Sequence, residues 1–343
     1  MQLCLRRDDG LPFKAAMPVV MPLGFRLRRY AGAAVAIATL LLANSCATIL
    51  SPDAAARLQQ TAGLIEEVKA FGKSLGIEPT AALRRTVREG PALSMLWLWM
   101  QREGTLALNA PMDIRTAIGY SAETQRVKVE QIYRVDGYSV YYRQGDEFAD
   151  SRSVATIGFA EEPVVRRVKV VLHEDLHGDG NFALPWEIEE ALVTPLGSLA
   201  TVEYFRWKGD KRNLQNALSS VGEERQGAKE LDALVARARI IFGQESIDAA
   251  KQRVLALISE YPAYQKQFER QIRGQHAPTV IEAKLSHDLA YYRYFDSIAG
   301  LAELAPDLRT LIGDLKAIPD NATHAAIEEY LRSLRNKYSA SSH

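Results

Sequence analysis

Two histidines and a glutamate in one short segment could bind and use a metal ion. Residues 173–177 read His-Glu-Asp-Leu-His, and three apolar residues, 170–172, precede them. On a helix, side chains four residues apart lie on one face, so His173 and His177 can reach the same ion. Glu174 can then take a proton from a water molecule that the metal polarises, which gives an attacking hydroxide. The segment therefore predicts a hydrolytic site, with Zn²⁺ as the expected ion.

A chance match to this pattern is uncommon. The chain has six histidines among 343 residues, and such a match should arise in under about 1% of chains of this kind. Residues 178–181, Gly-Asp-Gly-Asn, are a strong helix stop directly after the second histidine. Asp175 is unusual, because peptidases with this motif mostly carry an apolar residue there. Its carboxylate is expected to be solvated, or to hold a histidine by a hydrogen bond.

A catalytic zinc site needs a third protein ligand and an open fourth position. No histidine follows before His276, so we expect a carboxylate from the helix predicted to begin near Pro185. That helix offers three glutamates. Glu187 and Glu190 share a face one turn apart, whereas Glu189 is expected to point elsewhere. For any one of them, a solvated helix face is the alternative.

The segment resembles the predicted aminopeptidase family of Gram-negative bacteria, a gluzincin-type group in which two histidines and a glutamate bind zinc. The family's pattern implies Glu190 as the third ligand, thirteen residues after the second histidine, with a threonine four residues later at Thr194. Glu189 replaces the family's asparagine, and Pro195 stands where the family's helix is continuous. The resemblance implies a zinc-dependent peptidase, by its name an aminopeptidase, that acts on peptide or protein.

Weaker similarity to this family covers roughly residues 70–205 and 280–315. It implies that Tyr291 donates to the oxyanion of the tetrahedral intermediate, with His287 one turn away as the substitute. Glu161 and Glu162 are candidates for binding the α-ammonium group of a peptide. The plainer alternatives are that Tyr291 is a packing residue and that the two acids form a charged turn.

The first 45 residues have the pattern of an export signal. Three arginines precede an apolar run of about 13 residues, 31–43, which is shorter than the roughly 20 needed to cross a bilayer. Residues 42–46, Leu-Ala-Asn-Ser-Cys, resemble a bacterial lipobox, in which Cys46 is acylated after cleavage. We therefore expect a lipoprotein of the cell envelope that faces the periplasm, and Ala47, which is not aspartate, favours the outer membrane. An uncleaved N-terminal helix is the alternative anchor.

The charge balance argues against one class of partner. Lys plus Arg and Asp plus Glu both total 42, so the formal net charge is zero. Without a field of one sign, binding to nucleic acid is not expected. The expected partners are a peptide or protein substrate and, through the lipid anchor, a membrane. The sequence does not predict an oligomeric state.

Apolar periodicity predicts the secondary structure. Residues 52–100 have helical spacing, which includes Leu93, Leu96, Trp97 and Met100. Short β-prone runs follow between residues 110 and 158, at Val127, Val129, Tyr133, Val135, Val140, Tyr142 and Ile157. Helices are then predicted over residues 166–177 and 185–207, the second interrupted at Pro195. Residues 227–337 are predicted to be almost wholly helical, with breaks near Gly274, Pro306 and Pro319.

These elements predict a helix-dominated α+β fold, in which a small, mostly antiparallel sheet lies next to the zinc helix and a helical C-terminal region follows. After a signal of residues 1–45, residues 46–207 would hold the sheet and the zinc helices. Residues 208–343 would pack on the same catalytic unit. The rival hypothesis is a non-catalytic envelope lipoprotein, a binding or scaffolding module with a structural or degenerate metal site. A third, ranked last, is a chance motif on a surface helix without a cleft.

Overall fold

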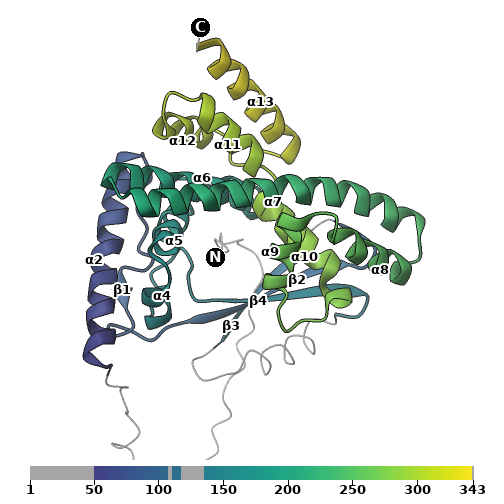
Figure 1. Cartoon of the computed structure of the whole chain (residues 1–343), viewed down its shortest axis with the longest axis horizontal. Coiled ribbons are helices and arrows are strands. Elements are labelled where there is room, and N and C mark those ends of the chain that lie inside the picture. The colour runs from purple at the N-terminus through teal and green to yellow at the C-terminus, as the bar shows by residue number, and fades with distance from the viewer. Residues whose placement is uncertain (1–49, 107–109, 117–134, 342–343) are drawn as a thin grey trace, which may run out of the picture. The chain divides into compact units, whose positions relative to one another are not determined.

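The computed structural model of the chain describes residues 50–106, 110–116 and 135–341 (Figure 1). One compact unit contains the described residues from Arg57 onward and every candidate site residue except Cys46. The predicted export signal, Cys46 and the predicted strand residues Val127, Val129 and Tyr133 lie outside the described residues. None of the helices in the described ranges has both the length and the apolar character that crossing a bilayer requires.

The sheet is small, and most of it is antiparallel, as predicted. β2 (Ser94–Arg102) lies between β3 (Ala110–Thr116) and β4 (Tyr138–Gly145), and both neighbours run antiparallel to it. A separate pair, β1 (Arg85–Thr86) and β5 (Val154–Ala155), is parallel.

The helix predicted over residues 52–100 is correct only in its first half. α2 ends at Ser74 (Pro52–Ser74), and residues 94–102 form the central strand β2. All residues from Met95 to Gln101 are buried. A strand buried on both faces shows no alternation, so its apolar run has the same appearance as a buried helix.

Two further helices follow the sheet, and the second carries part of the candidate site. α4 (Ile157–Glu161) begins at a capping residue, because the side chain of Thr156 accepts a hydrogen bond from the Phe159 N–H at 3.0 Å. The prediction that Ile157 lies in a strand is therefore wrong, since this cap starts a helix there. α5 (Val164–Leu176) follows and includes His173 and Glu174, with His177 as its C-terminal cap.

α6 (Trp186–Lys208) continues through Pro195, so the predicted interruption is wrong. Proline inside a helix removes one backbone hydrogen bond and costs about 3 kcal/mol. α6 is surrounded by α5, α7, α10 and α11, and every residue from Ile188 to Ser198 is buried. We attribute the unbroken helix to this burial on all sides, which outweighs the local cost of the proline.

The C-terminal region is helical, as predicted. It contains α7 (Lys211–Gln244), α8 (Ile247–Ile258), α9 (Pro262–Gln271), α10 (Ala277–Tyr292), α11 (Phe295–Leu304), α12 (Leu308–Lys316) and α13 (His324–Ser341). The predicted breaks at Gly274, Pro306 and Pro319 fall between helices. α10 packs against β2 and β4, so one helix of this region covers a face of the sheet (Figure 1).

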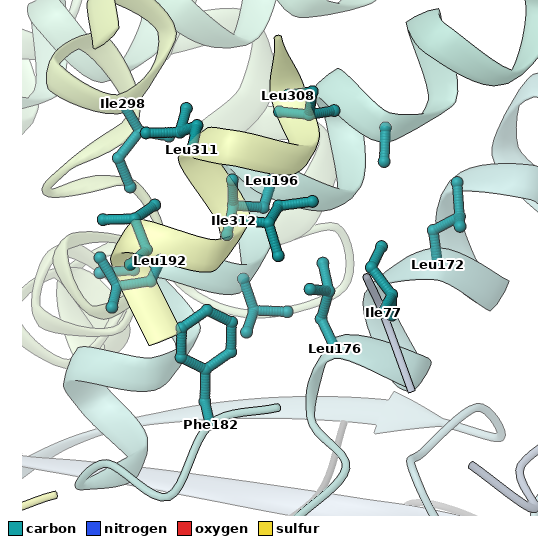
Figure 2. Packing of buried hydrophobic residues seen from close by; sticks show 14 of the residues in the cluster. Ile77, Leu172, Leu176, Phe182, Leu192, Leu196, Ile298, Leu308, Leu311 and Ile312 are labelled. Carbon is teal, nitrogen blue, oxygen red and sulfur yellow. The ribbon is translucent and has the colours of Figure 1, made fainter. Parts of the chain in front are cut away.

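Two hydrophobic clusters hold these elements together. The first joins α5 and α6 to α11, α12 and α13, and Figure 2 shows Leu172, Leu176, Leu192 and Leu196 gathered with Ile312. The second joins the sheet to α7, α8, α9 and α10. Both clusters combine residues from before and after position 208, so the site between them is framed by both halves of the chain.

Candidate metal centre

The two histidines are held in place by the buried side of α5. Val168, Val171, Leu172 and Leu176 point into the first hydrophobic cluster. His177 is 3% exposed, and His173 is partly buried and lines a cavity. The predicted helical placement of this motif is thus confirmed, and the histidines do not lie on an open surface.

α6 brings the predicted third ligand to these histidines. Glu190 is only 1% exposed and lies on the part of α6 that packs against α5. A glycine permits this close approach: a Cβ atom added to Gly197 would lie 3.2 Å from Cβ of His173 and 3.3 Å from its Cα. Any other residue at position 197 would press against the backbone that carries the first histidine.

His173, His177 and Glu190 form a buried group that could bind a metal ion. The Nε2 atoms of the two histidines are 3.2 Å apart, and they lie 3.6 and 3.4 Å from Oε2 of Glu190. Nitrogen and oxygen ligands about 2.0–2.2 Å from a tetrahedral zinc ion lie roughly 3.3–3.6 Å from one another. The three atoms therefore have the spacing of one face of a zinc coordination sphere.

The hydrogen bonding of Glu190 fits a metal ligand. Both of its carboxylate oxygens are buried without a hydrogen-bond partner among the described residues. The charged ring of His177, 3.4 Å away, offsets part of the cost of burying this carboxylate, and a bound cation would take over that role. The geometry and the chemistry of the donor set therefore agree.

Glu189 contacts the centre, contrary to the expectation that it points elsewhere. Its Oε1 lies 2.6 Å from Nδ1 of His177. His177 approaches α6 with its ring edge, so the ring's two nitrogens face consecutive glutamates. Burial alone would lower the pKa of His177, but Glu190 and Glu189 raise it to about 10. Binding of a cation to His177 must therefore displace a proton.

Glu174 has the environment of a general base. It is 4% exposed, and it lines the same cavity as His173. Burial raises the pKa of its carboxyl above the ordinary value. A carboxylate with a raised pKa accepts a proton more readily than one in water.

A cavity of about 550 Å³ adjoins the centre. Its walls come from β2, β4, α5, α6, α7, α9 and α10. Tyr291 and His287 of α10 line it together with His173 and Glu174, so the structure brings the predicted oxyanion donor and its substitute to the predicted base. This volume is suited to part of a peptide rather than to a water molecule alone.

Tyr291 and His287 are stacked, with ring centres 4.6 Å apart. The Tyr291 hydroxyl is buried and makes no hydrogen bond of good geometry among the described residues, and burial and the neighbouring Glu190 carboxylate raise its pKa well above the ordinary value. His287 contacts Oδ1 of Asp288 at 2.9 Å through Nδ1, while its Nε2 has no such partner in the described part of the chain. Both polar atoms are thus available to a ligand in the cavity.

The acids predicted to bind an ammonium group do not reach this cavity. Glu161 is exposed and lies 3.5 Å from Arg57, and Glu162 lies 3.4 Å from Arg166. Neither lines the cavity, whose wall begins at the next residue, Pro163. Their positions match the plainer alternative, a charged turn before α5.

Asp175 is neither solvated nor bonded to a histidine, contrary to both expectations. Its Oδ1 lies 2.5 Å from Nζ of Lys69 and accepts two further hydrogen bonds, at 2.9 Å each, from the backbone N–H and the hydroxyl of Thr80. Asn181 donates to the Asp175 carbonyl at 2.7 Å. Asp175 therefore ties the end of α5 to α2 and to the segment that follows α2.

Three residues near the centre were not predicted: Glu189 as a partner of His177, Asp288 as a partner of His287, and Arg143 in the cavity wall. The adjacency of His287 and Asp288 in the sequence is a signal that could have identified that pair. Arg143 comes from a distant strand and carries no such signal. Comparison of the chain with protein-family models, curated proteins and solved structures finds no match.

Proposed function

We propose that this chain is a zinc-dependent peptidase of the cell envelope, anchored through an acylated Cys46 and facing the periplasm. The observation that carries the proposal is the convergence of His173, His177 and Glu190 with zinc-like spacing, beside a cavity that Glu174 lines. The anchor rests on the sequence pattern of residues 1–46 alone.

The two histidines and Glu190 would hold the ion. When bound, zinc supplies a Lewis acid that polarises the scissile carbonyl and lowers the pKa of a water. Glu174 takes a proton from the attacking water and passes it to the nitrogen of the leaving amine. Its burial beside the cavity suits it to this exchange.

Tyr291 would stabilise the oxyanion that forms when water adds to the carbonyl. Its buried hydroxyl lines the cavity and has no other partner among the described residues, and a donor of that kind is worth several kcal/mol in a transition state. His287 lies beside it, where Asp288 fixes the orientation of the ring. These two side chains line the same cavity as Glu174 in the proposed site.

Two features favour a peptidase over a non-catalytic scaffold. Three side chains of the metal-binding types converge in the described part of the chain, which leaves a fourth position for water. A structural zinc site is closed by four protein ligands and needs no cavity. Here a cavity of about 550 Å³ opens directly onto His173.

The test is metal analysis of the purified protein beside two variants, each assayed on a peptide library. Glu174→Gln should retain about one zinc ion and lose activity, because the amide cannot accept the proton. His173→Ala should lose both. A wild-type protein that binds no zinc, or a Glu174→Gln variant as active as wild type, would refute the proposal.

A further inference from the structure

The cavity contains an arginine that the proposed hydrolysis does not use. Arg143 of β4 lines the cavity beside Trp97, its cross-strand neighbour on β2. Its guanidinium carbon lies 5.9 Å from the centre of the Tyr291 ring. Burial alone would lower the pKa of Arg143, but the neighbouring Tyr291 and Tyr141, and then Glu190, raise it. Arg143 lines the same cavity as the proposed ligand His173 and the proposed base Glu174.

The sheet holds Arg143 in this position. Tyr141 lies two residues earlier on β4, so both side chains project from the same face. The Tyr141 ring packs 5.1 Å from the ring of His287, which shows that this face is directed towards α10 and the cavity. A charged group on a strand is placed more firmly than one on a loop.

The charges that line the cavity favour an anion once a dication is bound. Four basic and three acidic side chains line it, but Lys169 is paired with Glu224 and Arg166 with Glu162. The other lining charges balance, with Arg143 and Arg270 against Glu147 and the proposed base Glu174. A bound dication would add two positive charges against the one negative charge of Glu190. A negatively charged group on the substrate is thus better matched than an ammonium group.

We infer that Arg143 binds the C-terminal carboxylate of a peptide, so that the site removes the last residue of the chain. This inference rests on the proposed peptidase function. The planar guanidinium can bind both oxygens of a carboxylate at once. One residue spans about 3.5 Å, so a carboxylate bound to Arg143 would place the last peptide bond within the cavity that His173 and Glu174 also line.

The reaction balances as the hydrolysis of one amide. Water adds its oxygen to the carbonyl carbon, and the bond from that carbon to nitrogen breaks. The nitrogen takes up both protons of the water. The products are a shortened peptide with a new carboxylate and a free amino acid with an ammonium group.

The test compares one pool of random tetrapeptides in four chemical forms on the zinc-loaded full chain. The N-terminus is free or acetylated, and the C-terminus is a carboxylate or an amide. We expect N-terminal acetylation to change kcat/KM for the carboxylate forms by no more than about twofold. C-terminal amidation should lower kcat/KM at least about 100-fold. Mass spectrometry should show loss of single C-terminal residues.

Variants separate recognition by Arg143 from general electrostatics. Arg143→Gln should raise KM for the carboxylate pool at least about tenfold with kcat little changed, because the contact is made before and during the reaction. The KM of Arg143→Lys should lie between those of wild type and Arg143→Gln. Lysine keeps the positive charge but cannot bind both carboxylate oxygens in the way the planar guanidinium does. Arg166→Gln is the matched control. It removes a charge that lines the same cavity but is half exposed and paired with Glu162, so the preference for carboxylate should remain.

A binding measurement provides a readout without turnover. Calorimetry on the metal-free protein should show that N-acetyl-trialanine with a free carboxylate binds at least about tenfold more tightly than its amide, and that Arg143→Gln removes the difference. Equal cleavage of amide and carboxylate pools would overturn the assignment of Arg143 and leave the proposed peptidase intact. No cleavage of any of the four pools would overturn both.

Discussion

The Nδ1 atom of His177 lies 2.6 Å from Oε1 of Glu189, the residue directly before the proposed ligand Glu190. One turn of α6 therefore supplies a carboxylate for the ion and a second carboxylate that orients an imidazole. Histidine ligands commonly donate their other ring N–H in this way, which fixes the tautomer and the angle of the ring.

Glu189→Ala should weaken zinc binding by about 10- to 100-fold, because the His177 ring loses its orienting partner. Competition with a chromophoric chelator measures this affinity. Glu187→Ala on the same helix is the matched control, since Glu187 lies two residues away and is only partly buried. Equal zinc affinity in the two variants would show that Glu189 does not orient the ligand.

Gly197→Ala should also weaken zinc binding, although residue 197 is no ligand. The added methyl would press on Cβ and Cα of His173 and move α5 away from Glu190. We expect a loss of about 1–3 kcal/mol in the free energy of unfolding as well. Calorimetric zinc titration and urea denaturation measure the two effects.

Gly222→Ala is the control for this change. Gly222 lies in α7, and a Cβ added there meets nothing within 4 Å. Alanine in an open helical position should stabilise the protein by roughly 0.5–1 kcal/mol. If both alanine variants bind zinc like wild type, the close packing of α5 on α6 does not position the ligands.

Lys69→Met should destabilise the protein by about 3–5 kcal/mol, because it leaves the carboxylate of Asp175 buried without its cation. The free energy of unfolding in urea checks this value. Lys266→Met makes the same change in a pair whose side chains are 77% and 69% exposed, where less than about 1 kcal/mol is expected. Similar losses in the two variants would contradict a structural role for the buried pair.

The His287 side chain should make stability depend on pH. Burial lowers its pKa to about 4 from 6.5, and Asp288 offsets this only in part. Between these values the unfolded chain carries a proton on His287 that the folded chain lacks. The free energy of unfolding should therefore fall as the pH drops from 6.5 to 4, by about 3 kcal/mol from this residue.

The comparison that isolates this effect is wild type against His287→Gln, each denatured in urea at several pH values between 4 and 7. The variant should lose less stability across the window. Other titrating groups, such as His324, are present in both proteins and cancel in the difference. Parallel curves would show that His287 does not titrate as its burial implies.

The sequence was most informative where the chemistry is local. His173, Glu174 and His177 lie within five residues, so their spacing was sufficient to predict that the two histidines converge. The choice of Glu190 among three glutamates on the next helix came from the resemblance to the aminopeptidase family. Glu189 was misplaced because a helical wheel describes where a side chain leaves the backbone and not how far it reaches. Residues 95–101 were taken for helix because a doubly buried strand has no alternation.

What could not be predicted depends on contacts between distant segments. Lys69 and Asp175 are 106 residues apart, and their ion pair replaces the solvation or the histidine contact that was expected for Asp175. Arg143 reaches the cavity only because β4 pairs with β2 and α10 covers both strands. Neither relation leaves a pattern in the local sequence.

The proposed ligands lie on two consecutive helices, whereas the walls of the cavity come from residues between Trp97 and Tyr292. Binding of the proposed ion therefore needs only α5 and α6, whereas binding of the proposed substrate also needs the sheet and α10. A molecule in which the sheet had separated from α10 would still present both histidines and Glu190 to a cation, yet it would have no wall against which to seat a peptide. Metal content alone would then overstate the fraction of molecules in a preparation that can also bind a peptide.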